Sequence, residues 1–92
     1  MNAEELEAVW NLAQVRTEDD WRVLPEGKTL TLHIASAGVG LGVSKVEAVR
    51  LSGSLVYARS TRGDLYAFAA SDVFACTLDG AEARSRKAGF SP

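Results

Sequence analysis

The first part of the chain repeats its apolar residues at a helical spacing. Four of them stand at positions i, i+3, i+4 and i+7 and so share one helix face: Leu6, Val9, Trp10 and Ala13. Asn2 followed by Glu5 is typical of a helix start, because the two side chains can cap each other's backbone N–H. We predict a helix over residues 2–15. A helix of this length is marginal alone in water, so its apolar face is expected to dock on the rest of the domain.

The period changes to two further along the chain, which indicates strands. Residues 17–20 read as a polar connection and 21–24 as a short edge strand. Leu30, Leu32 and Ile34 alternate with polar residues. Glycines alternate with aliphatic residues from Gly38 to Val43, and such a segment permits a bend or close approach by another group. The remaining pattern predicts one long bent strand and three turn-bounded strands, over residues 38–51, 54–59, 64–69 and 73–78.

These elements define an α+β fold that is mainly β. We expect one domain over residues 1–80, with helix 2–15 packed on a small curved antiparallel sheet or an SH3-like barrel of about five strands within 21–78. Residues 81–92 form a basic C-terminal tail in this interpretation. The segment Tyr66-Ala67-Phe68, followed by a break and Asp72-Val73, resembles in its spacing the final strands of SH3-like barrels. That resemblance implies a small binding module, although a fold alone does not fix a function.

Two of the predicted strands are apolar on both faces. In residues 65–70 and in residues 73–78, alternate positions on each side are mostly apolar. A sheet with one wet face alternates more cleanly. We therefore expect the second face to be covered in part by the helix and in part by a second copy of the chain or by another protein.

Composition and charge narrow the classes of function. The chain has 92 residues, 47% hydrophobic and 24% charged, as in ordinary globular domains. Its net charge is −2, and residues 1–26 alone contain seven acidic and two basic residues. This balance disfavours a dedicated nucleic-acid binder. The acidic first residues are unlike a signal peptide, and no apolar run is long enough to span a membrane, so we expect a cytoplasmic protein.

No motif predicts catalysis. The single cysteine, Cys76, lies in an apolar run and is interpreted as core, and it excludes a disulfide or a thiolate zinc site within one chain. The single histidine, His33, has no nucleophile beside it in the sequence. Glu18, Asp19 and Asp20 are consecutive, which does not suit a calcium loop. We predict no enzyme activity, no cofactor and no metal.

The preferred hypothesis is a non-catalytic protein-interaction or regulatory module, an adaptor or homodimer that self-associates through an apolar sheet face. Aromatic and arginine side chains near the hairpins have the composition of interaction hot spots. The candidate partner-binding residues are Trp21, Tyr57, Arg59, Arg62, Tyr66 and Phe68. The alternative hypothesis is a small nucleic-acid-associated regulator, with Tyr57 and Tyr66 for stacking. Its modest basic patch would comprise Arg50, Arg59, Arg62, Arg84, Arg86 and Lys87.

Overall fold

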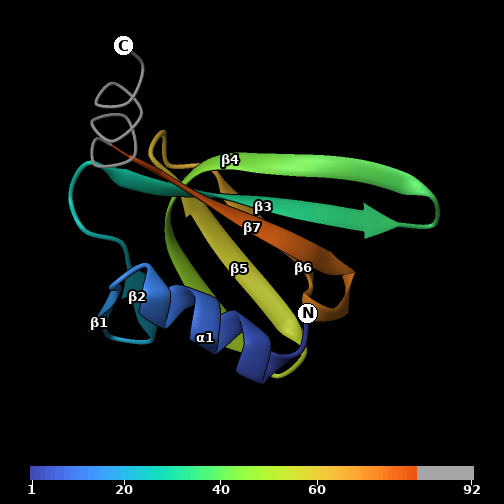
Figure 1. The fold of residues 1–92 in the computed structure, drawn as a ribbon, viewed down its shortest axis with the longest axis horizontal. Helices are drawn as coiled ribbons and strands as arrows, with labels where there is room; N and C mark the ends of the chain where they lie inside the picture. Colours follow the sequence, from blue (N-terminus) through green and yellow to red (C-terminus); the bar gives the residue numbers. More distant parts are fainter. Residues whose placement is uncertain (81–92) are drawn as a thin grey trace, which may run out of the picture.

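The computed structural model describes residues 1–80, and the predicted basic tail lies outside the described residues. The chain begins with helix α1, Ala3–Leu12 (Figure 1). Asn2 caps it as predicted: its side chain accepts from the Glu5 N–H, and the Glu5 carboxylate accepts from the Asn2 N–H. The helix is shorter than the predicted 2–15. Ala13 is the C-cap, and Gln14 has a left-handed φ of 61°, which no helix can continue through.

A small hairpin follows where a polar connection was predicted. Strands β1, Arg16–Glu18, and β2, Trp21–Val23, pair antiparallel around a turn in which Asp19 has a φ of 57°. Aspartate tolerates this conformation better than most residues. The strand predicted at 21–24 is present as β2, but its predicted edge position is wrong, because β2 lies between β1 and β4. Every residue of β1 is exposed, so no hydrophobic alternation marks it in the sequence.

Five longer strands and one 3₁₀ turn complete the fold. They are β3, Lys28–Ser36; β4, Val39–Ser52; β5, Leu55–Ser60; β6, Leu65–Ala69; η1, Ala70–Asp72; and β7, Val73–Gly80. All pairings are antiparallel, with β7, β3, β4, β5 and β6 as successive neighbours. The α+β, mainly β class is confirmed, with seven strands instead of about five. The sheet is curved but not closed, since β6 pairs only with β5 and β7 only with β3.

Strand β4 is the long bent strand that the glycine-containing segment predicts. Its first half pairs with β3, whereas its second half pairs with β5 on one side and β2 on the other. Lys45 has a left-handed φ of 59°, and the β4–β5 register shifts between Val46 and Ala48. These irregularities lie where the strand changes partners, as expected of a β-bulge that bends a sheet. The β3–β4 hairpin projects as an arm beyond the other strands (Figure 1).

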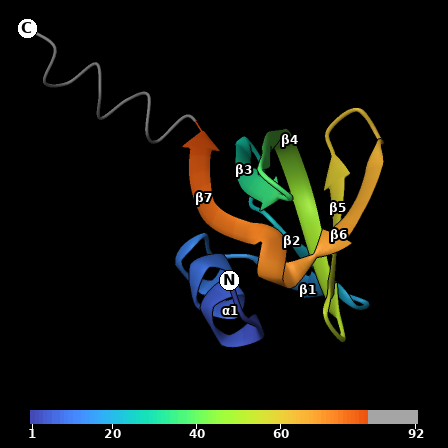
Figure 2. The same ribbon diagram turned by 90° about the vertical axis from the view of Figure 1, so that its right-hand side faces the viewer.

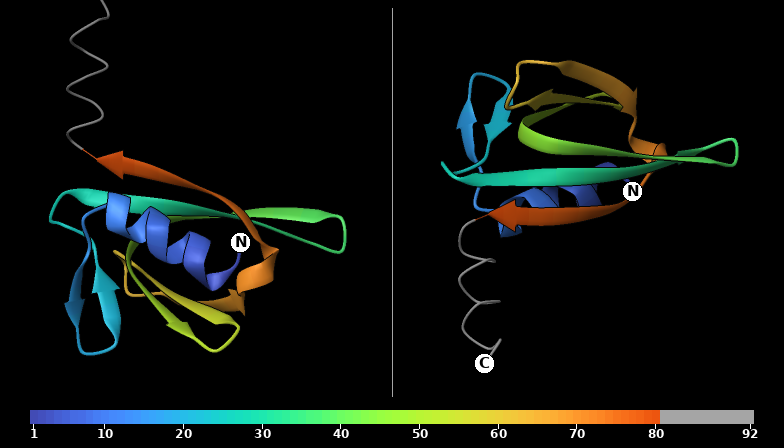
Figure 3. Two further views of the ribbon diagram at one scale, coloured as in Figure 1. Left: turned by 60° about the horizontal axis from the view of Figure 1, so that its bottom comes forward. Right: turned by 90° about the horizontal axis from the view of Figure 1, so that it is seen from above.

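The core lies between α1 and the concave face of the sheet. Figure 2 shows the strands curving around this space, and Figure 3 shows α1 lying across it, between the β1–β2 hairpin and η1. Leu6 and Trp10 are fully buried, Ala13 is 2% exposed, and Val9 is partly buried against the same cluster. Their partners come mainly from the inward faces of β3, β4 and β5. The helix therefore covers the concave face and leaves the outer face and the strand edges uncovered.

Candidate functional site

The predicted partner-binding residues divide between two faces of the sheet. On β5, buried Val56 and Ala58 point inward, so Tyr57 and Arg59 point outward. On β6, Tyr66 and Phe68 stand opposite Ala58 and Val56 in register and pack against the core. Arg62 lies in the β5–β6 turn. The structure therefore does not bring the six candidates together into one surface.

On the outer face, aromatic rings and arginines contact each other. The Arg59 guanidinium lies 5.1 Å from the centre of the Trp21 ring, and its Nε donates to Glu47 at 3.2 Å. Arg50 lies 5.5 Å from the centre of the Tyr57 ring, its register partner on β5. Such cation–π contacts are worth about 0.5–1 kcal/mol at exposed sites. Trp21 and Tyr57 therefore each contact an arginine of the same chain on the outer face.

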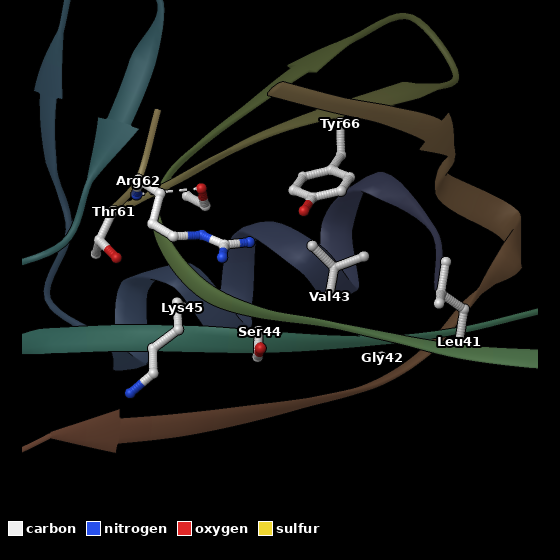
Figure 4. Close-up of a pocket in the computed structure, with 9 residues that line it drawn as sticks. Leu41, Gly42, Val43, Ser44, Lys45, Thr61, Arg62 and Tyr66 are labelled. Carbon is white, nitrogen blue, oxygen red and sulfur yellow. Dashed lines mark hydrogen bonds between the residues drawn. The ribbon is translucent and has the colours of Figure 1, made fainter. Parts of the chain in front are cut away.

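A hollow of about 550 Å³ opens where β4 bends away from β5 and β6 (Figure 4). Nine residues line it: Leu41, Gly42, Val43, Ser44, Lys45, Ser60, Thr61, Arg62 and Tyr66. Figure 4 shows the Arg62 guanidinium and the Tyr66 hydroxyl pointing toward each other, with Val43 below the ring and Lys45 directed away from Arg62. The hollow thus combines an apolar floor with a cationic group and a hydroxyl.

The turn that carries Arg62 is held by a buried hydroxyl. Ser60 is 2% exposed, and its Oγ accepts from the N–H groups of Arg62 and Asp64 at 3.3 and 3.1 Å. The Arg62 side chain itself is exposed and donates through one Nη to Asp64 at 3.2 Å. A guanidinium has five N–H groups. Arg62 therefore keeps donors for a ligand after pairing with Asp64.

One wall of the hollow is an unpaired strand edge. The β4–β5 ladder begins at Val46 and Ser60, so residues 39–44 of β4 pair only with β3. Val39 and Leu41 on this segment are 68% and 61% exposed. Cβ atoms added to Gly40 and Gly42 would meet nothing within 4 Å in the described structure. The glycines are thus not required by close packing within residues 1–80.

Two further strand edges lack the usual protection against pairing. Within residues 1–80, no strand lies on the outer edge of β6 or of β7. Neither strand contains lysine, arginine or proline, the residues that block edge pairing, and the two carry one acid, Asp79. Leu65 on β6 and Phe74 on β7 are 62% and 63% exposed. The edge strand β1, by contrast, carries the exposed Arg16–Glu18 ion pair.

The outer face of β3 and β7 holds the single histidine. His33 Nε2 lies 2.9 Å from Thr77 Oγ1, and its ring is tilted against Phe74 at a centroid distance of 6.1 Å. Among residues 1–80, no acidic group contacts the second ring nitrogen to orient it as a base, as nucleophilic catalysis requires. His33 therefore makes a polar contact with Thr77 between β3 and β7.

Cys76 faces the core from β7 and is half-buried. Burial raises the pKa of its thiol, an effect opposed by the nearby N-terminal ammonium. The described part of the chain contains no group of three or more His, Cys, Asp or Glu side chains placed to hold a metal ion.

Several surface features have no signal in the sequence. Lys45, Thr61 and Leu41 come to the hollow only because β4 bends, and the exposure of Phe74 depends on the register of β7.

No helix within residues 1–80 is long and apolar enough to cross a membrane. No protein-family model, curated protein or solved structure matches this chain.

Proposed function

We propose that the protein is a non-catalytic interaction module that self-associates through the open edges of its sheet. The observation that carries the proposal is the chemistry of β6 and β7: both are edge strands without a blocking charge or proline, and each exposes a large apolar side chain. Unpaired backbone groups beside apolar side chains form a template for another strand.

A second copy of the chain is the proposed occupant because one molecule supplies two unprotected edges. Pairing of β6 with β7 of the next copy continues the sheet head to tail, whereas pairing of like edges across a two-fold axis gives a homodimer. The proposed interface lies at the strand edges and not on the apolar sheet face expected from the sequence, because α1 already covers the concave face.

The experiment compares three variants by light scattering. Leu65→Lys places a charge on β6 and Phe74→Lys places one on β7, whereas Leu12→Lys makes the same kind of change on α1, at a side chain that is 82% exposed. We expect the unaltered chain to exceed its 9.8 kDa monomer mass, and an edge variant to return it toward that mass while the Leu12 variant does not.

The pattern of loss identifies the pairing. If only one of the two edge variants abolishes association, like strands pair with each other. If each of the two variants abolishes association, β6 of one copy pairs with β7 of the next. A monomer from about 1 µM to about 1 mM, or equal association of all variants, overturns the proposal. Circular dichroism of each variant checks that the sheet is still formed.

The nucleic-acid alternative has less support. Arg59 is paired with Glu47, so part of the positive charge of the expected patch is neutralised within the chain. Arg62 lines the hollow, whereas Arg50 contacts Tyr57 on the outer face, so the two arginines do not share one surface.

A further inference from the structure

We infer that the hollow beside β4 binds an extended, acidic segment of another protein. The segment pairs with the free edge of β4 at residues 39–44 and places a carboxylate against Arg62. This site is separate from the β6 and β7 edges and does not depend on self-association.

The backbone of β4 makes a polypeptide the best-matched ligand. Residues 39–44 have a ladder on the β3 side only, so alternate N–H and C=O groups point toward the hollow without a strand partner. An added strand satisfies these groups in regular order, which is the basis of β-augmentation. On the outer face of this segment, Gly40 and Gly42 carry no side chain, and Ser44 carries a small one.

The side chains around the edge select the kind of segment. Exposed Leu41 and the half-buried ring of Tyr66 provide apolar contact for alternate residues of an added strand. Arg62 keeps unpaired N–H donors next to the Tyr66 hydroxyl, and together they match a carboxylate. Lys45 also lines the hollow, but its side chain is directed away from Arg62, so Arg62 is the cation placed beside the Tyr66 hydroxyl.

Charge also argues against the chain's own C-terminal segment as the occupant. Residues 81–92 contain Arg84, Arg86 and Lys87 but only one acid, Glu82. A basic segment beside Arg62 and Lys45 brings like charges together, which is unfavourable.

The experiment uses NMR of the isotope-labelled full chain with two synthetic peptides. One is acetyl-Ser-Val-Thr-Val-Glu-Thr-amide, and the other replaces its glutamate with lysine. We expect the acidic peptide to shift the amide signals of residues 39–44 and the Arg62 side-chain signal, and to bind about tenfold more tightly than the basic peptide.

Two substitutions of opposite effect test the carboxylate contact. Arg62→Gln is expected to weaken binding of the acidic peptide about tenfold. Asp64→Asn is expected to strengthen it severalfold, because it removes the carboxylate that competes for Arg62. Arg50→Gln removes an arginine from the outer face and is the matched control, with unchanged binding.

Several outcomes overturn the inference. They are no shift at about 1 mM peptide, equal binding of the two peptides, shifts confined to β6 or β7, and loss of binding in the Arg50 variant. A deoxythymidine oligonucleotide of about ten nucleotides that shifts the same signals more strongly than the acidic peptide also overturns it, in favour of nucleic acid. Repeating the titration with Phe74→Lys separates this site from self-association, since binding in the hollow is expected to persist.

Discussion

Replacing Leu6 with alanine tests whether docking of α1 holds the domain together. Leu6 is fully buried in the cluster that joins the helix to the sheet. The change removes three carbon atoms, worth about 2–2.5 kcal/mol in transfer free energy, and leaves a cavity that raises the cost to about 3–4 kcal/mol. A domain of 92 residues has a total stability of about 5–14 kcal/mol, so this single change removes a large fraction of it.

Leu12→Ala is the matched control, because it makes the same chemical change on the same helix at a side chain that is 82% exposed. Its expected cost is within about 0.5 kcal/mol of zero. Urea unfolding is followed by fluorescence of buried Trp10, with Trp21 replaced by phenylalanine so that only one indole reports. We expect the Leu6 variant to lose about 3–4 kcal/mol of unfolding free energy in urea and, in a thermal scan, to melt at least about 12 °C lower. A cost below about 1 kcal/mol for Leu6, or equal costs at the two positions, refutes the packing argument.

Two further predictions concern backbone strain and thiol chemistry. In Gly42→Ala the added methyl group enters open space at an ordinary φ, so we expect the variant to be more stable by about 0.5–1 kcal/mol. Gly63 has a φ of 92°, so we expect Gly63→Ala to be less stable. Thermal unfolding of the two variants gives the sign of each change. Because the pKa of Cys76 is raised in the folded chain, the unfolded chain loses the thiol proton first as pH rises. Stability is therefore expected to fall between the unfolded and folded pKa values, and the fall should be absent in Cys76→Ala; equal alkaline behaviour contradicts this.

The features that the sequence predicted are local ones. The cap formed by Asn2 and Glu5, the alternation around Leu32 and the long strand through Gly42 all depend on residues close together in the chain. The break before Val73 also proved to be a single helical turn, η1. Each of these is set by backbone torsion preferences and by a burial period that a short window contains.

The features that it missed depend on long-range register. When both faces of a strand are apolar, its pattern does not show which residues point inward, so the sequence does not separate Tyr57 from Tyr66, although the two face opposite sides. Strand β1 was missed because its pairing with β2 is decided by the turn at Asp19 and not by burial. The hollow required the left-handed Lys45 and the bend of β4, neither of which glycine spacing alone can locate.

The free edges of this one sheet differ in the side chains that flank them, and this difference decides what each edge can accept. Backbone groups are the same on every strand, so they provide affinity without selectivity. The edge of β1 is guarded by Arg16 and Glu18, which discourages pairing. The β7 edge has exposed apolar side chains and a single acid, which favours a similar uncharged strand from a second copy. The β4 edge lies beside Arg62, a side chain on another hairpin that the bend of β4 brings within reach, and the selectivity that we propose for an acidic strand rests on this side chain.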